Sequence, residues 1–202
     1  MNNAHPTITI DLVLDRLQAK EVLRAVLHSI LFHRLFGTVK PRTFEVLDVT
    51  MPGVDDEEIT HLVDDKVDAF WRGVEGDANK RGQIVVTFSE KRPRKSWFLI
   101  GEDHQRRDTP AFGQRCVPPA CTDTQPPLTQ PRWLFVFVPA SHTERQKFNA
   151  ELAATLTKSL QTMLVHSSSE KGRSAVPLIT NASSISPFPI KMAVKVGGVE
   201  VA

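Results

Sequence analysis

Apolar residues are densest between residues 19 and 36, where they cover most of the circumference of an α-helix. Only Glu21, Arg24 and His28 interrupt this surface, as a narrow polar strip. The stretch is too short and too charged to span a bilayer, which takes roughly 20 mostly apolar residues. The pattern therefore predicts the central helix of a soluble core, buried on more than one side and ending near Gly37.

Two further stretches, 56–74 and 141–165, repeat apolar residues at helical spacing. Each begins with a capping pair, Asp55 with Glu58 and Ser141 with Glu144, whose side chains can accept and return hydrogen bonds at a helix start. The apolar stripes are Ile59, Leu62, Val63, Val67, Phe70, Trp71 and Val74 in the first stretch, and Phe148, Leu152, Leu156, Leu160, Met163 and Leu164 in the second. We expect two amphipathic helices, the second followed by a polar break at 166–171.

Alternating or β-branched runs predict five strands. They span residues 7–14, 43–49, 83–89, 133–138 and 188–196. The second should end at residues 51–53 (Met-Pro-Gly). The fourth is nearly all apolar, as interior strands are, and Pro189 places the last near a sheet edge. The order of elements favours an α+β fold with helices against one face of a mostly antiparallel sheet.

Composition narrows the class of protein further. A chain of 202 residues suits one domain, and a net charge of +2 gives no general reason to expect nucleic acid or an anionic membrane as a partner. The first residues lack the pattern of a secretory signal, and two cysteines suit a reducing compartment, so we expect a cytoplasmic protein. Residues 99–132 hold six of the fourteen prolines and no apolar period, which predicts an irregular insertion.

The motifs of common enzymes are absent from the sequence: there is no nucleophile elbow, phosphate loop, paired zinc motif or dinucleotide fingerprint. We therefore expect no catalytic residues, no cofactor and no metal. Cys116 and Cys121 with His104 come nearest to a metal cluster, but their spacing and number favour thiols in a loop. His28 and His33 point to different helix faces, so we expect one on the polar strip and one packed, not a shared ligand site.

The informative pair is Trp97-Phe98. Trp71 and Trp133 have places in a predicted helix and strand, whereas Trp97 follows a basic run and adjoins the proline-rich stretch. The basic run consists of Lys91, Arg92, Arg94 and Lys95. One interpretation is an exposed aromatic anchor that binds proteins; the other, equally weighted on the residues alone, is that both rings pack under the loop.

Three features together resemble the autophagy-related protein 101 family. They are the segment VLHSILFHR at 26–34, the acidic helix start at 55–58, and a strand followed by the basic run and Ser96-Trp97-Phe98. The likeness covers residues 7–98 and, more loosely, 133–196. Between about 119 and 131 the chain departs from the family pattern, which indicates an insertion or a displaced exon boundary. The resemblance implies a single HORMA-like domain over 1–202, interrupted at about 99–132, with a C-terminal segment that wraps back on the core.

The same resemblance implies a non-enzymatic scaffold of the autophagy initiation kinase complex. It would pair with the HORMA domain of autophagy-related protein 13 and lie in the cytoplasm at the preautophagosomal structure. Trp97 and Phe98 would form an exposed finger that recruits downstream factors. The partner would contact the helix at 141–165, for which Arg145, Asn149 and Thr157 are candidates.

Two other classes of function stay open at this point. The basic run with Trp97 and Phe98 could form a single-stranded nucleic-acid-binding module, because basic residues beside aromatic rings bind single strands. Salt-dependent binding that Trp97→Ala abolishes would favour this alternative. A small-molecule enzyme without a recognisable motif comes third.

Overall fold

The computed structural model describes residues 8–35, 39–75, 81–88, 132–135, 142–174 and 190–201. The helices are α1 (Ala19–Phe32), α2 (Glu57–Val74), α3 (His142–Ser168) and the short α4 (Glu170–Ser174). The strands are β1 (Asp11–Leu14), β2 (Pro41–Val46), β3 (Val49–Val54), β4 (Arg81–Phe88), β5 (Arg132–Phe135), β6 (Ile190–Val196) and β7 (Val199–Val201). The predicted α+β class, with three main helices on a mostly antiparallel sheet, is confirmed.

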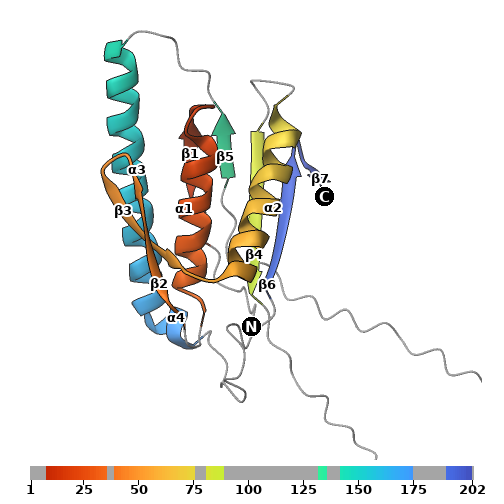
Figure 1. The fold of residues 1–202 in the computed structure, drawn as a ribbon. Helices are drawn as coiled ribbons and strands as arrows, with labels where there is room; N and C mark the ends of the chain where they lie inside the picture. Colours follow the sequence, from red (N-terminus) through yellow and green to blue (C-terminus); the bar gives the residue numbers. More distant parts are fainter. Residues whose placement is uncertain are drawn as a thin grey trace, which may run out of the picture.

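Five strands form the main sheet, in the order β1-β5-β4-β6-β7 (Figure 1). Among the described strands, β1 and β5 are the one parallel pair, and β5 is an interior strand, as its apolar sequence predicted. β6 pairs with β4 from Val196 opposite Gly82 to Ile190 opposite Phe88. The described part of the C-terminal segment therefore folds back along the core. β6 lies one strand from the edge, which is β7, a short strand that the pattern did not reveal.

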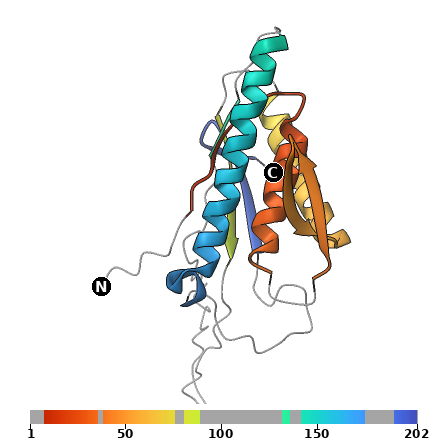
Figure 2. The same cartoon turned by 90° about the vertical axis from the view of Figure 1, so that its left-hand side faces the viewer.

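The central helix α1 is enclosed by other elements. It lies with α2 on one face of the main sheet, the β2–β3 hairpin covers its outer side, and α3 packs beside it (Figures 1 and 2). Ten of its fourteen residues are buried. The expected burial on more than one side is thus confirmed, although the helix ends at Phe32; Gly37 lies outside the described residues.

The β2–β3 hairpin corrects the strand expected at 43–49. The expected terminator at residues 51–53 lies inside β3, and the chain turns earlier, at Leu47 and Asp48. Both turn residues are left-handed, with φ of 49° and 61°, the backbone that a two-residue hairpin turn requires. Gly53 lets the hairpin approach α1, since a Cβ there would lie 2.4 Å from Phe44 Cε2 and 3.0 Å from His28 Cβ.

Smaller differences concern the other two helices. The N-cap of α2 is Asp56, one residue later than expected; its carboxylate accepts a 3.0 Å hydrogen bond from the backbone N–H of Ile59. α3 continues to Ser168, through the first half of the polar break expected at 166–171. Leu164, assigned to its core stripe, is 50% exposed. Ser141 of the second capping pair lies outside the described residues.

Candidate functional site

The site residues expected from the sequence lie outside the described part of the chain. This holds for Trp97 and Phe98, for Lys91, Arg92, Arg94 and Lys95, and for Cys116, Cys121 and His104. Their roles stay predictions. Within the described ranges, no three His, Cys, Asp or Glu residues are grouped so that they could hold a metal ion. None of the helices described here is long and apolar enough to cross a bilayer.

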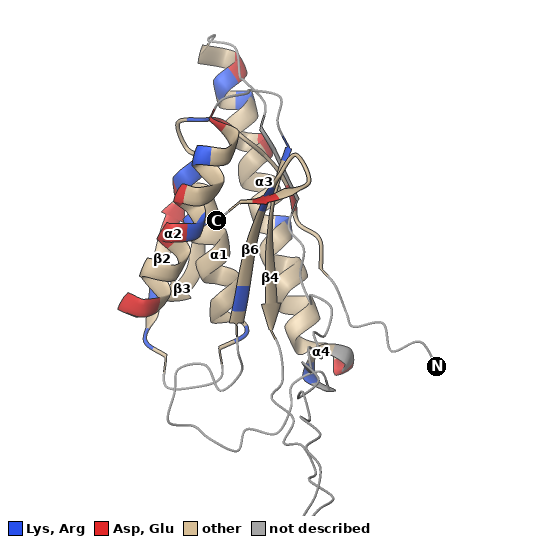
Figure 3. Cartoon of the chain, turned by 90° about the vertical axis from the view of Figure 1, so that its right-hand side faces the viewer, with Lys and Arg blue, Asp and Glu red and all other residues tan. Residues whose placement is uncertain are grey.

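Charged side chains join α1 to α2. Lys20 Nζ lies 2.7 Å from Asp68 Oδ1, and Arg24 Nε lies 2.5 Å from Asp64 Oδ1. The hydrogen bond from Lys20 is the main reason that the pKa of Asp68 is lowered. Lys20 Nζ also lies 5.8 Å from the ring centroid of Trp71. Charged residues follow the outward side of α2 (Figure 3), and these contacts tie two of its carboxylates to α1.

His28 was expected on a polar strip, but it is only 2% exposed. The β2–β3 hairpin covers it, and its ring centroid lies 4.8 Å from that of Phe44. Burial lowers the pKa of His28, and the charge of Arg42 adds to the effect. Its buried Nδ1 has no hydrogen-bond partner among the described residues. His28 is therefore a neutral core residue whose protonation would place a charge inside the protein.

The side of α3 that faces away from the core carries a row of uncharged residues over about five turns, bordered by the exposed Lys158. We call it the outer stripe of α3. Its members are Ala150, Ala154, Thr157, Gln161, Leu164, Val165 and Ser168, all exposed. Leu164 and Val165 are 50% and 70% exposed, large values for apolar side chains. Of the residues expected at a partner surface, Arg145 and Thr157 are exposed, whereas Asn149 is half-buried.

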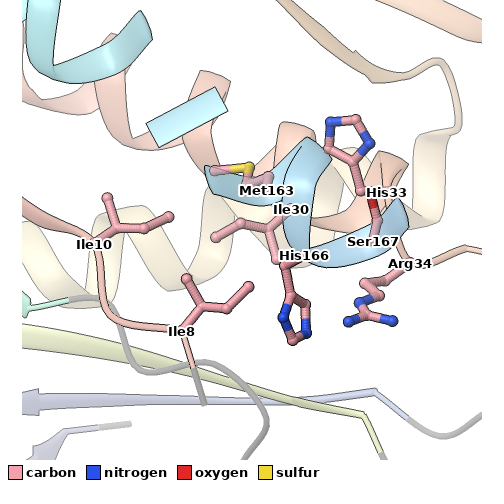
Figure 4. A pocket seen from close by; sticks show the side chains of 8 residues that line it. All are labelled: Ile8, Ile10, Ile30, His33, Arg34, Met163, His166 and Ser167. Atoms are coloured by element: carbon pink, nitrogen blue, oxygen red, sulfur yellow. The ribbon is translucent and has the colours of Figure 1, made fainter. Parts of the chain in front are cut away.

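A small pocket lies where the end of α1 meets the C-terminal part of α3 and the residues before β1 (Figure 4). Its lining residues are Ile8, Ile10, Ile30, His33, Arg34, Met163, His166 and Ser167. The three most buried, Ile10, Ile30 and Met163, are 4–5% exposed and form an apolar floor. The other five are half-buried. The cavity is small, about 20 Å³, which is room for one water-sized group.

The polar groups of this pocket lack anionic partners. The Nε2 atoms of His33 and His166 are buried and have no hydrogen-bond partner among the described residues. Arg34 Nη1 donates one long hydrogen bond, 3.5 Å, to the carbonyl oxygen of Gly172, and no described carboxylate pairs with it. Burial lowers the pKa of Arg34, and burial followed by the charge of Arg34 lowers the pKa of both histidines. Arg34 stays protonated at neutral pH, so the pocket carries a cation.

Sequence analysis did not find this pocket. His33 and Arg34 follow α1, whereas His166 stands in a stretch expected to be a polar break, and no spacing rule connects the two. The helical continuation of α3 to Ser168 is what turns His166 toward the end of α1. Ser29 Oγ, 3.6 Å from Met163 Sδ, links the same two helices one turn away.

Comparison with known proteins gives one consistent family. A family model described as Autophagy-related protein 101 matches residues 11–183. Autophagy-related protein 101 of Schizosaccharomyces pombe is 40% identical over 95 residues, which cover 47% of this chain and 52% of that protein. The Arabidopsis thaliana protein of the same name is 33% identical over 91 residues, covering 44% and 42%. The chain thus spans about half the length of the curated relatives it matches.

Proposed function

The chain belongs to the autophagy-related protein 101 family, and from this premise we propose that it is a non-enzymatic scaffold subunit of the autophagy initiation kinase complex. Membership gives it an autophagy-related role and a HORMA-like fold, which the three helices and the mostly antiparallel sheet fit. The proposal adds that residues 1–202 form one such domain, interrupted at about 99–132. It also places the protein in the cytoplasm, at the preautophagosomal structure.

The outer stripe of α3 is the observation that supports pairing of the chain with another protein. The stripe combines two large exposed apolar residues with small or polar neighbours and is bordered by the exposed Lys158, while the opposite side of α3 packs on the core. Adjacent exposed apolar residues are typical of protein-binding surfaces. We assign this surface to the HORMA domain of autophagy-related protein 13.

Two substitutions on the outer stripe test the pairing. We expect Leu164→Glu with Val165→Glu to reduce co-purification of the autophagy-related protein 13 HORMA domain at least tenfold, because both charges would be desolvated in the interface. Val199→Glu is the matched control, since Val199 is 67% exposed but lies in β7. The circular-dichroism melting transition should be the same in all variants. If the double variant pairs with the autophagy-related protein 13 HORMA domain as well as the parent does, the outer stripe of α3 is not the interface.

The proposal includes a second protein-binding surface, the finger formed by Trp97 and Phe98, which the basic run flanks. The family resemblance is what supports it. A finger that recruits downstream factors would act separately from the surface that assembles the complex. The basic run would keep the loop solvated and steer acidic partners toward it, an effect that weakens with salt.

Replacing both finger residues with alanine separates recruitment from folding. If both rings are exposed, we expect the free energy of unfolding to change by no more than about 0.5 kcal/mol. Pairing with autophagy-related protein 13 should persist, while autophagosome formation in cells should fail. A loss of about 3 to 5 kcal/mol would instead place the rings in the core. Salt-dependent binding of single-stranded nucleic acid, lost in Trp97→Ala, would favour the nucleic-acid-binding alternative.

A further inference from the structure

The pocket at the end of α1 contains a cation that the described structure leaves uncompensated. Arg34 is half-buried, and its one polar contact among the described residues is the long hydrogen bond to the Gly172 carbonyl. An ion withdrawn from water without a counter-charge costs free energy, so proteins rarely keep such a group unless it has an anionic partner. The buried nitrogens of His33 and His166 add two unused hydrogen-bonding groups to the same pocket.

Among the described residues, no acid pairs with this cation. Glu170, in the neighbouring α4, is exposed and forms no ion pair with Arg34. The stretches that adjoin the pocket-forming segments in sequence, 1–7, 36–38 and 175–189, contain no aspartate or glutamate. The described residues and these adjoining stretches therefore supply no counter-ion for Arg34, which points to a second molecule as its source.

The residues that line the pocket restrict which chemical groups of that molecule could bind there. Its floor, Ile10, Ile30 and Met163, is apolar and suits one or two methyl groups. Around it, the Arg34 guanidinium and the His166 ring lie on the same side as Ile8 in Figure 4, whereas the His33 ring points the other way. A guanidinium matches the planar geometry of a carboxylate, and a neutral imidazole can donate one more hydrogen bond.

We propose that this pocket binds a carboxylate that lies next to a small branched aliphatic group, presented by a partner protein. The carboxylate would sit on Arg34 with a hydrogen bond from His166, and the aliphatic group would enter over Ile10, Ile30 and Met163. A phosphate is less well suited, because the apolar floor cannot satisfy its additional oxygens. The lining residues include no member of the outer stripe of α3 and neither Trp97 nor Phe98, so the inference goes beyond the proposed function and does not depend on it.

Small probes test the site on the purified full chain. The readout is the ¹H–¹³C NMR signal of Cε1–H in His33 and His166, assigned from the His33→Gln and His166→Gln spectra. We expect N-acetylvaline to shift the His166 signal saturably, with a Kd on the order of millimolar for so small a ligand. The neutral N-acetylvalinamide should cause no saturable shift. N-acetylglycine, which lacks the branched group, should bind at least about fivefold more weakly.

Two arginine variants decide whether Arg34 binds the probe. Arg34→Gln should weaken N-acetylvaline binding at least tenfold while leaving the melting temperature without ligand unchanged or higher, since it removes an unpaired charge. Arg173→Gln, at an exposed arginine in α4, is the matched control and should bind as the parent does. If Arg34→Gln does not fold, Arg34 is structural and the proposal fails. It is also overturned if inorganic phosphate binds more tightly than N-acetylvaline, or if Arg34→Gln binds N-acetylvaline as tightly as the parent does.

Discussion

α1 and α3 show how differently one chain can use two helices. α1 buries ten of fourteen residues, because the main sheet, α2, α3 and the β2–β3 hairpin surround it. α3 is nearly twice as long, yet only four of its 27 residues are buried, and its outer stripe is uncovered. The difference separates two kinds of position: substitutions in α1 should act on folding, and those on the outer stripe should act on binding.

The largest effect is expected in α1, from Leu27→Ala. Leu27 is fully buried, so truncation removes apolar contacts and leaves a cavity. We expect a loss of about 2 to 5 kcal/mol in the free energy of unfolding, measured by urea denaturation. Pairing by the remaining folded protein should be unaffected. A loss below about 0.5 kcal/mol would mean that α1 is not the enclosed helix that its burial indicates.

An intermediate effect is expected on acidification, and the buried histidine of α1 should contribute more than that of α3. The pKa of His28 is lowered in the folded protein, so below about pH 6.5 the unfolded state binds more protons. Stability from this source is complete above that pH and falls as the pH drops toward the folded-state pKa, by about 1.4 kcal/mol for each unit between the two pKa values. The lowered pKa values of His33 and His166 act with the same sign.

Urea midpoints measured between pH 7.5 and 5.5 test this comparison. His28→Gln should flatten the pH dependence more than His166→Gln, because His28 is 2% exposed whereas His166 is half-buried. An equal slope in the parent and in His28→Gln would show that another group controls acid sensitivity.

The smallest effect is expected on the outer stripe, from Leu164→Ala. With half of its surface in water, Leu164 should contribute no more than about 0.5 kcal/mol to the free energy of unfolding. Its neighbour Met163 provides an internal contrast, since it is 5% exposed and Met163→Ala should cost about 2 to 5 kcal/mol. Similar losses for the two variants would mean that the stripe is covered by another part of the chain.

Sequence patterns correctly predicted the elements whose apolar repeat continues over many residues. The apolar circumference of α1 and the stripe of α2 extend over three or more turns, and the alternation of β6 places Met192, Val194 and Val196 in the core as expected. Signals of only two or three residues gave a wrong prediction at the end of a strand. Pro52 and Gly53 resemble a breaker, yet a two-stranded hairpin tolerates proline at an edge, and Gly53 is needed for close packing.

What the sequence could not predict depends on contacts between distant segments. His28 is polar by type and follows the polar strip of α1, but a hairpin some twenty residues later in the chain covers it. The pocket brings together Arg34, from the turn after α1, and His166, from α3, and no periodicity within either segment predicts this contact. The finger rests on a family resemblance alone, because Trp97 and Phe98 lie outside the described residues.

The strand order has a consequence for how the protein is made. β1 and β4 leave the ribosome first, but they are not neighbours; β5, translated after residues 89–131, lies between them. At a translation rate of roughly 5–20 residues per second, several seconds pass between the synthesis of β4 and that of β5. In this interval β1 and β4 have unpaired edges, and pairing them directly would exclude β5 from the sheet. The growing chain, rather than the finished protein, is then the state most open to misfolding and to chaperone capture.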